Sequence, residues 1–91
     1  MQVKWSRAAL ADLRRLYEFL ESIDQPAAAR TIQSLTAAPT RLMHQPRIGE
    51  RLDEFEAREV RRLLVGNYEI RYELSTDALY VLRVWHTREH R

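Results

Sequence analysis

The 91-residue sequence has no cysteine, which excludes disulfide bonds and thiolate metal sites. It has only two glycines, and they do not form a glycine-rich loop of the kind that cradles phosphate groups. No apolar run approaches the roughly 20 residues of a membrane-spanning helix. Residues 1–6 also lack the apolar core of a secretion signal. We therefore expect a cytoplasmic protein that carries neither a cofactor nor a metal.

Lysine is nearly absent. Of the 15 basic residues only Lys4 is a lysine, which leaves 14 arginines, and the net charge is +2. Arginine makes planar, bidentate contacts with carboxylates and phosphates, where lysine acts as a hydrated point charge. A GC-rich coding sequence produces the same bias, so the bias alone identifies no ligand.

The length predicts one domain, residues 1–91, with a modest core. Ser6 can cap a helix, and three-to-four spacing of apolar residues predicts that this helix extends over 7–22. The apolar residues are Leu10, Leu13, Leu16, Leu20 and Ile23. A second helix begins at Pro26 and closes at 46–49, and Pro39 is expected to kink it or to end and restart it. The short link predicts an antiparallel helix hairpin.

After residue 56 the apolar period changes to two. Strands are predicted over 57–65, 68–74 and 78–86, with Gly66-Asn67 as a tight turn, in addition to a short strand over 2–5. The order β-α-α-β-β-β defines an α+β domain with a three-stranded antiparallel meander. The residues expected to face the helices are Tyr68, Ile70, Tyr72 and Leu74. With a three-residue loop over 75–77, these would pair with Tyr80, Leu82 and Val84.

This register leaves a mixed outer face, made of Val60, Arg62, Leu64, Glu69, Arg71, Glu73, Leu79, Val81, Arg83 and Trp85. Arg62 would lie opposite Arg71, and either Glu69 and Glu73 or an anionic partner group must relieve that repulsion. Trp85 beside aliphatic residues would form an exposed apolar patch, and such patches mark binding. We take Val60, Arg62, Leu64, Arg71, Leu79 and Val81 as candidates for a partner-binding face. A one-residue slip in register would exchange the two faces.

The ordered set of motifs resembles the RelE/ParE toxin superfamily over nearly the whole chain. The motifs are Trp5-Ser6 before a helix with Asp12-Leu13, Pro26-Ala27-Ala28, residues 46–49, Gly66-Asn67-Tyr68 with Tyr72, and residues 81–89. The resemblance implies a growth-inhibiting toxin of a type II toxin–antitoxin system. It also implies a cognate antitoxin, ParD-like or related, with a DNA-binding part and a segment that wraps the toxin. Exposed helix positions such as Tyr17 and Phe19, or the outer face, would receive that segment.

The superfamily divides by mechanism. Ribonuclease members cleave messenger RNA on the ribosome with basic residues on the open sheet face and a proton-transfer group near the C-terminus. In this sequence the arginine expected after the aromatic residue of the sheet turn is replaced by Glu69. One of two basic positions on the preceding strand is Val60, and the other is Arg62. No tyrosine follows His86.

These departures favour a ParE-like toxin that blocks DNA gyrase without chemistry of its own. Its target-binding residues would be Arg83, Trp85, His86, Arg88 and His90. The alternative is a ribosome-dependent endoribonuclease that uses Arg62, Arg71 and His86, because imidazole can transfer protons near neutral pH. A second alternative is a non-toxic module that only binds its antitoxin.

Overall fold

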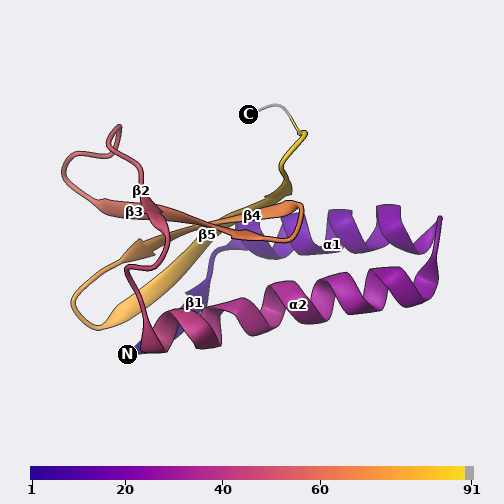
Figure 1. Ribbon diagram of the computed structural model, residues 1–91, viewed down its shortest axis with the longest axis horizontal. Coiled ribbons are helices and arrows are strands. Elements are labelled where there is room, and N and C mark those ends of the chain that lie inside the picture. Colours follow the sequence, from indigo (N-terminus) through magenta and orange to yellow (C-terminus); the bar gives the residue numbers. More distant parts are fainter. Residues whose placement is uncertain (90–91) are drawn as a thin grey trace.

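Two helices lie against one face of a five-stranded sheet in the computed structural model, which describes residues 1–89 (Figure 1). In chain order the elements are β1 (Gln2–Trp5), α1 (Arg7–Glu21), α2 (Gln25–His44), β2 (Glu50–Arg51), β3 (Glu59–Val65), β4 (Tyr68–Leu74) and β5 (Ala78–His86). The spatial order is β1-β5-β4-β3-β2. β1 is parallel to β5 and the other pairs are antiparallel. The predicted α+β fold is confirmed, with β2 as an additional strand in a segment expected to be loop.

Both helices begin with a side-chain cap, of which the one at Ser6 was predicted and the one at Asp24 was not. The Ser6 side chain accepts a hydrogen bond from the N–H of Ala9 at 2.9 Å, and Asp24 accepts one from Ala27 at 3.1 Å. These caps satisfy backbone donors that have no partner in the first helical turn. α2 continues through Pro39, which is buried, so the expectation that the helix ends and restarts there was wrong.

The core lies between the helix hairpin and the sheet. Its fully buried side chains are Leu35 and Leu42 of α2 and Ile70, Tyr72, Leu79, Val81 and Val84 of the sheet. On α1 the buried stripe is Ala9, Asp12 and Leu16. Leu10 and Ile23, expected on the apolar side of the helix, are instead 53% and 70% exposed. The helix is turned so that the carboxylate of Asp12 lies on the buried stripe, between Ala9 and Leu16.

The β3–β4 hairpin has the predicted register. Gly66 has a φ of 59° and is followed by a residue of negative φ, as in a type II′ turn. The turn fixes the pairing of Val65 with Tyr68 and therefore sets Arg62 opposite Arg71, as predicted. Tyr72 faces the helices, where its hydroxyl donates to the carbonyl of Pro46 at 2.8 Å.

The β4–β5 hairpin has a different register from the predicted one. Leu74 pairs with Leu79 and Tyr72 with Val81, one residue later than expected along β5. Leu79 and Val81 therefore face the helices and are fully buried, and their placement on the outer face was wrong. The physical reason is a connection one residue longer than the predicted three, because a one-residue slip moves every side chain to the opposite face.

A second shift follows at Leu82. Arg71 pairs with Arg83, so Leu82 has no partner on β4 and forms a β-bulge. The longer loop and the bulge each shift the register by one residue, so side chains after Leu82 return to the faces that were predicted. Arg83 and Trp85 therefore lie on the outer side, as predicted. Tyr80, which was expected to face the helices, pairs with Glu73 on the outer side. We call the side of the sheet that the helices do not cover the open face.

Candidate functional site

Three arginines cross the open face in one row. Arg62 of β3 pairs with Arg71 of β4, which pairs with Arg83 of β5. Like charges placed directly opposite on adjacent strands repel one another. The row therefore needs anionic partners, and the structure supplies them from three different elements.

Glu69 lies two residue pairs along the sheet from this row, on the same face, and its side chain is only 8% exposed. Its carboxylate accepts a hydrogen bond from Arg71 at 3.1 Å and lies 3.6 Å from the Arg62 guanidinium. Arg62 also donates to Glu50 of β2 at 2.7 Å. The predicted relief by Glu69 is confirmed. Relief by Glu73 was wrong, because that carboxylate is bound by Arg58 at 2.7 Å.

Trp85 is not the exposed apolar anchor that the sequence predicted. It is 5% exposed and lies between two of the arginines of the row. The guanidinium of Arg71 is 4.9 Å from the ring centroid and that of Arg83 is 5.3 Å from it. Cation–π attraction of this kind holds both guanidinium groups against the indole. Trp85 therefore supports the arginine row from below, and the cations cover it.

The third carboxylate comes from α1. Asp12 accepts hydrogen bonds from Arg83 at 2.8 and 3.0 Å and from the N–H of Val84 at 2.9 Å. Burial raises the pKa of Asp12, but the hydrogen bonds from Arg83 and Val84 outweigh it, and the pKa lies below its ordinary value. The carboxylate is therefore charged at neutral pH, and it fastens α1 to the C-terminal half of β5.

The position of Asp12 follows from the shortness of β1. β1 ends at Trp5, which leaves the outer edge of β5 without a strand partner beyond Val81. Ser6 fills the first gap, since its N–H donates to Val81 at 3.0 Å and its hydroxyl to Leu82 at 2.8 Å. Asp12 fills the next gap at Val84. The sequence signal for this contact is a carboxylate three positions after Ala9 and four before Leu16, on the buried side of the helix.

His86 lies on the other side of the sheet from the arginine row. It pairs with Tyr68, and the two rings meet edge to face with centroids 5.2 Å apart. Both side chains line a pocket of about 320 Å³ together with Leu16, Phe19 and Leu20 of the helix layer. The set proposed for ribonuclease chemistry, Arg62, Arg71 and His86, is therefore not assembled on one face.

Hydrogen bonds hold the turn that follows β5. The N–H of Arg88 donates to His86 Nδ1 at 3.1 Å, and the N–H of Thr87 donates to the carbonyl of Asn67 at 2.9 Å. Glu89 accepts from the N–H of His86 at 3.0 Å and lies 2.9 Å from Arg15 of α1. The backbone around Arg88 is thus held in place while its side chain is exposed. His90, the remaining candidate, lies outside the described residues.

The candidate partner-binding face is smaller than the sequence suggested. Leu64 is 56% exposed, and Arg62 and Arg71 are half-buried. Val60 is on the open face opposite Glu73, but it is fully buried. Glu73, the residue opposite Val60, is bound by Arg58 of the loop before β3. Within residues 1–89 no group of three His, Cys, Asp or Glu side chains could hold a metal ion. No helix in that part of the chain has the length and apolarity to cross a membrane.

Comparison with known proteins agrees with the resemblance. The family model of the ParE toxin of type II toxin–antitoxin systems matches residues 3–91. No curated protein is matched by sequence. Among solved structures, the chain is similar to one described as the chromosomal ParDE TA system from P. aeruginosa. The TM-score is 0.79 at 22% sequence identity, and the match covers 94% of this chain and 95% of the other.

The chain therefore belongs to the ParE toxin family of type II toxin–antitoxin systems. Membership in this family implies an antitoxin partner.

Proposed function

We propose that this chain is a toxin that inhibits DNA gyrase by binding to it, without chemistry of its own, and that a cognate ParD-like antitoxin neutralises it. The observation that carries the proposal is the internal pairing of the arginine row. Arg62, Arg71 and Arg83 each have a carboxylate of the same chain within 3.1 Å or less. This pairing supports a binding role over a phosphate-cleaving one.

Cleavage of RNA through its 2′-hydroxyl needs cations that stabilise the charge developing on the phosphate, and a proton-transfer group within reach. Here Glu69, a buried carboxylate on the open face, lies beside Arg62 and Arg71 and would repel that phosphate. His86 faces the helices, so the arginines and the imidazole cannot act on one phosphate. Both observations count against the endoribonuclease alternative.

The gyrase-binding surface that we propose is the end of β5 and the turn after it. Arg83 is 40% exposed at its side chain and Arg88 is exposed, so both can reach a partner. Trp85 lies beneath Arg83 and fixes its direction. His86 shapes the turn by accepting from Arg88. An arginine whose surroundings are already ordered loses little side-chain entropy when it binds.

Supercoiling by purified gyrase tests this surface directly. The chain should inhibit the reaction, and Arg88→Glu should raise the concentration needed for half inhibition by about tenfold or more, which corresponds to about 1.4 kcal/mol of lost binding. Arg51→Glu on β2 is the matched control, because Arg51 is also exposed but lies on an edge strand that β4 and β3 separate from β5. Equal effects of the two variants would refute the assignment to β5.

Pulse-labelling in cells that lack the antitoxin separates the three functions. A fall in thymidine incorporation before methionine incorporation supports gyrase as the target. An early stop in methionine incorporation, with DNA synthesis continuing, would mean the ribonuclease alternative. Unchanged growth and labelling would mean a non-toxic module.

A further inference from the structure

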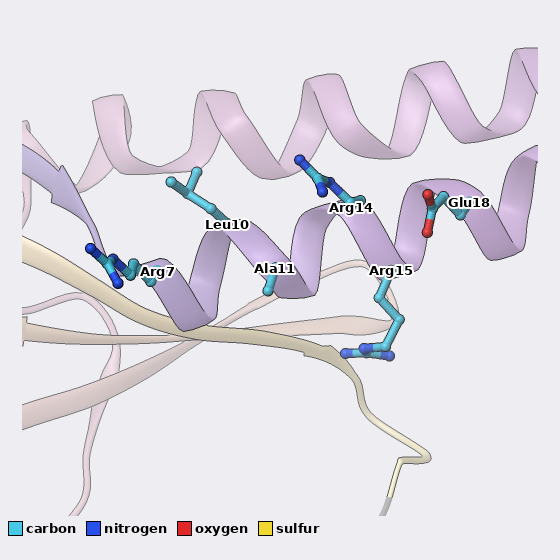
Figure 2. A pocket seen from close by; sticks show the side chains of 6 residues that line it. All are labelled: Arg7, Leu10, Ala11, Arg14, Arg15 and Glu18. Atoms are coloured by element: carbon cyan, nitrogen blue, oxygen red, sulfur yellow. The ribbon is translucent and has the colours of Figure 1, made fainter.

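The outer side of α1 carries a shallow groove that the fold does not use. Its lining residues are Arg7, Leu10, Ala11, Arg14, Arg15 and Glu18, and its volume is about 340 Å³ (Figure 2). In Figure 2, Leu10 and Arg14 project to one side of the helix and Arg15 to the other, toward the C-terminal segment. We call this feature the α1 groove.

Two cations of the α1 groove have no carboxylate partner within the described residues. Most arginines of the sheet and loops pair with carboxylates, and Arg15 pairs with Asp12 and Glu89. No ion pair among residues 1–89 includes Arg7 or Arg14. This holds for Arg14 although Glu18 follows it by one helical turn, a spacing at which such pairs form. The neighbouring helix α2 adds no negative charge, because Gln25–His44 contains neither Asp nor Glu.

An apolar strip separates the two cations. Leu10 is 53% exposed, and Ala11 beside it is exposed and small. A small residue on a helix surface lets a second helix approach closely. Along two turns of the helix, the α1 groove therefore presents the Arg7 cation, then the apolar strip, and then the Arg14 cation.

The spacing selects the kind of partner. Seven residues separate Arg7 from Arg14, which is a distance of about 10.5 Å along a helix of 1.5 Å rise. A partner helix matches this with acidic residues at i and i+7 and an aliphatic residue at i+3 or i+4, all on one face. An extended segment does not match, since residues on one side of a strand recur about every 6.8 Å. We infer that the α1 groove binds an acidic amphipathic helix of this pattern, contributed by the toxin-binding segment of the antitoxin.

This inference rests on the proposed pairing with an antitoxin and names its contact surface. A nucleic acid fits the α1 groove less well, because Leu10 would be buried against phosphates and Glu18 would repel them. A disordered acidic segment that folds onto the helix would bury Leu10 and neutralise both arginines. Arg15 of the α1 groove pairs with Glu89, so the groove adjoins the turn after β5, where we place gyrase, but Arg7 and Arg14 form no ion pair with the described residues of that turn.

The test measures the affinity of the purified antitoxin for the whole chain by calorimetry. Arg7→Glu and Arg14→Glu should each weaken binding by about tenfold, and Leu10→Gln by a similar factor. Arg30→Glu on α2 is the matched control, because Arg30 is also exposed, helical and unpaired within the described residues, yet lies outside the α1 groove. All four positions are exposed, and circular dichroism checks that each variant keeps its fold. An Asp→Arg or Glu→Arg change in the antitoxin should restore the affinity lost in Arg14→Glu.

The outcomes separate the two proposals. If the antitoxin binds the wild-type chain and the Arg7→Glu/Arg14→Glu double variant with the same affinity, that result would overturn this inference and leave the proposed pairing with an antitoxin in place. Failure of the antitoxin to bind the wild-type chain would overturn the proposed pairing as well. If the double variant loses binding to a short DNA duplex but keeps its affinity for the antitoxin, the two arginines bind phosphates. That result would overturn the inference. Weakened antitoxin binding with gyrase inhibition retained would support it.

Discussion

Replacing Asp12 by asparagine removes one negative charge and leaves the shape of the side chain almost unchanged. In the wild-type chain the carboxylate accepts two hydrogen bonds from Arg83 and one from the N–H of Val84. The asparagine oxygen can keep one of these bonds, but its amide group presents donors to a guanidinium that has only donors. The variant therefore loses the charge-assisted bonds that join α1 to β5.

The cost can be bounded from the geometry. Removing one partner of a buried ion pair costs about 3–5 kcal/mol when the other charge stays buried. The Arg83 side chain is 40% exposed, so water can solvate its freed charge. We therefore expect a loss of about 2–3 kcal/mol, at the level of charge-assisted hydrogen bonds. For a domain of this size that lowers Tm by about 10–20 °C.

Thermal and urea unfolding followed by circular dichroism measure this loss. Asp53→Asn is the control, because Asp53 is exposed and forms no ion pair within residues 1–89; its effect should stay below about 0.5 kcal/mol. The pKa of Asp12 is lowered in the folded state, so its stabilisation is present above the unfolded value of about 3.9 and is lost as pH falls through the folded pKa. The wild-type and variant curves should therefore converge only below about pH 4. A Tm difference at pH 7 no larger than that of the control would refute the reasoning.

Three further changes test the loop before β2 and the open face. Tyr72→Phe leaves the buried N–H of Gly49 without its acceptor and should cost about 1–3 kcal/mol in urea unfolding. Burial raises the pKa of Tyr72, so the wild-type advantage over Tyr72→Phe should also shrink as pH rises above about 10. Gly49→Ala would place a methyl group 2.5 Å from the Tyr72 hydroxyl and 2.6 Å from the Arg62 carbonyl oxygen, and should lower stability by about 1–3 kcal/mol; a Tm equal to wild type would contradict the packing described. Arg58→Ala removes a surface pair with Glu73 and should leave the Tm close to that of the wild-type chain, so a clear fall in Tm would show that this pair also orders the loop before β3.

Much of the fold was predictable because local chemistry determines it. Ser6 caps α1 where the sequence indicates, and Gly66 sets the turn that aligns β3 with β4. A two-residue turn leaves no freedom in register, so the placement of Arg62 opposite Arg71 followed from two residues. The family resemblance rested on the same short, ordered features, and the match over residues 3–91 confirmed it.

The β4–β5 register could not be predicted in the same way. Its loop permits more than one length, and the bulge at Leu82 occurs where β1 ends and Ser6 bonds to the edge of β5. That bond joins residues 76 positions apart in the chain, and no local pattern contains it. Leu79 and Val81 precede the bulge, and their faces were assigned wrongly because the connection before them is one residue longer than predicted.

The candidate site also has features that the sequence predicts and features that depend on long-range contacts. The sequence by itself determined the elements, the family and the presence of arginines, an acidic residue and a tryptophan on the last strands, because caps, turns and side-chain periods act over a few residues. Only the tertiary structure decided what these side chains do. It buries Trp85 beneath two arginines, turns His86 toward the helices and brings Asp12 of α1 to Arg83 of β5. Burial and ion pairing depend on which distant segments meet, and that is settled by packing the helix hairpin against the whole sheet.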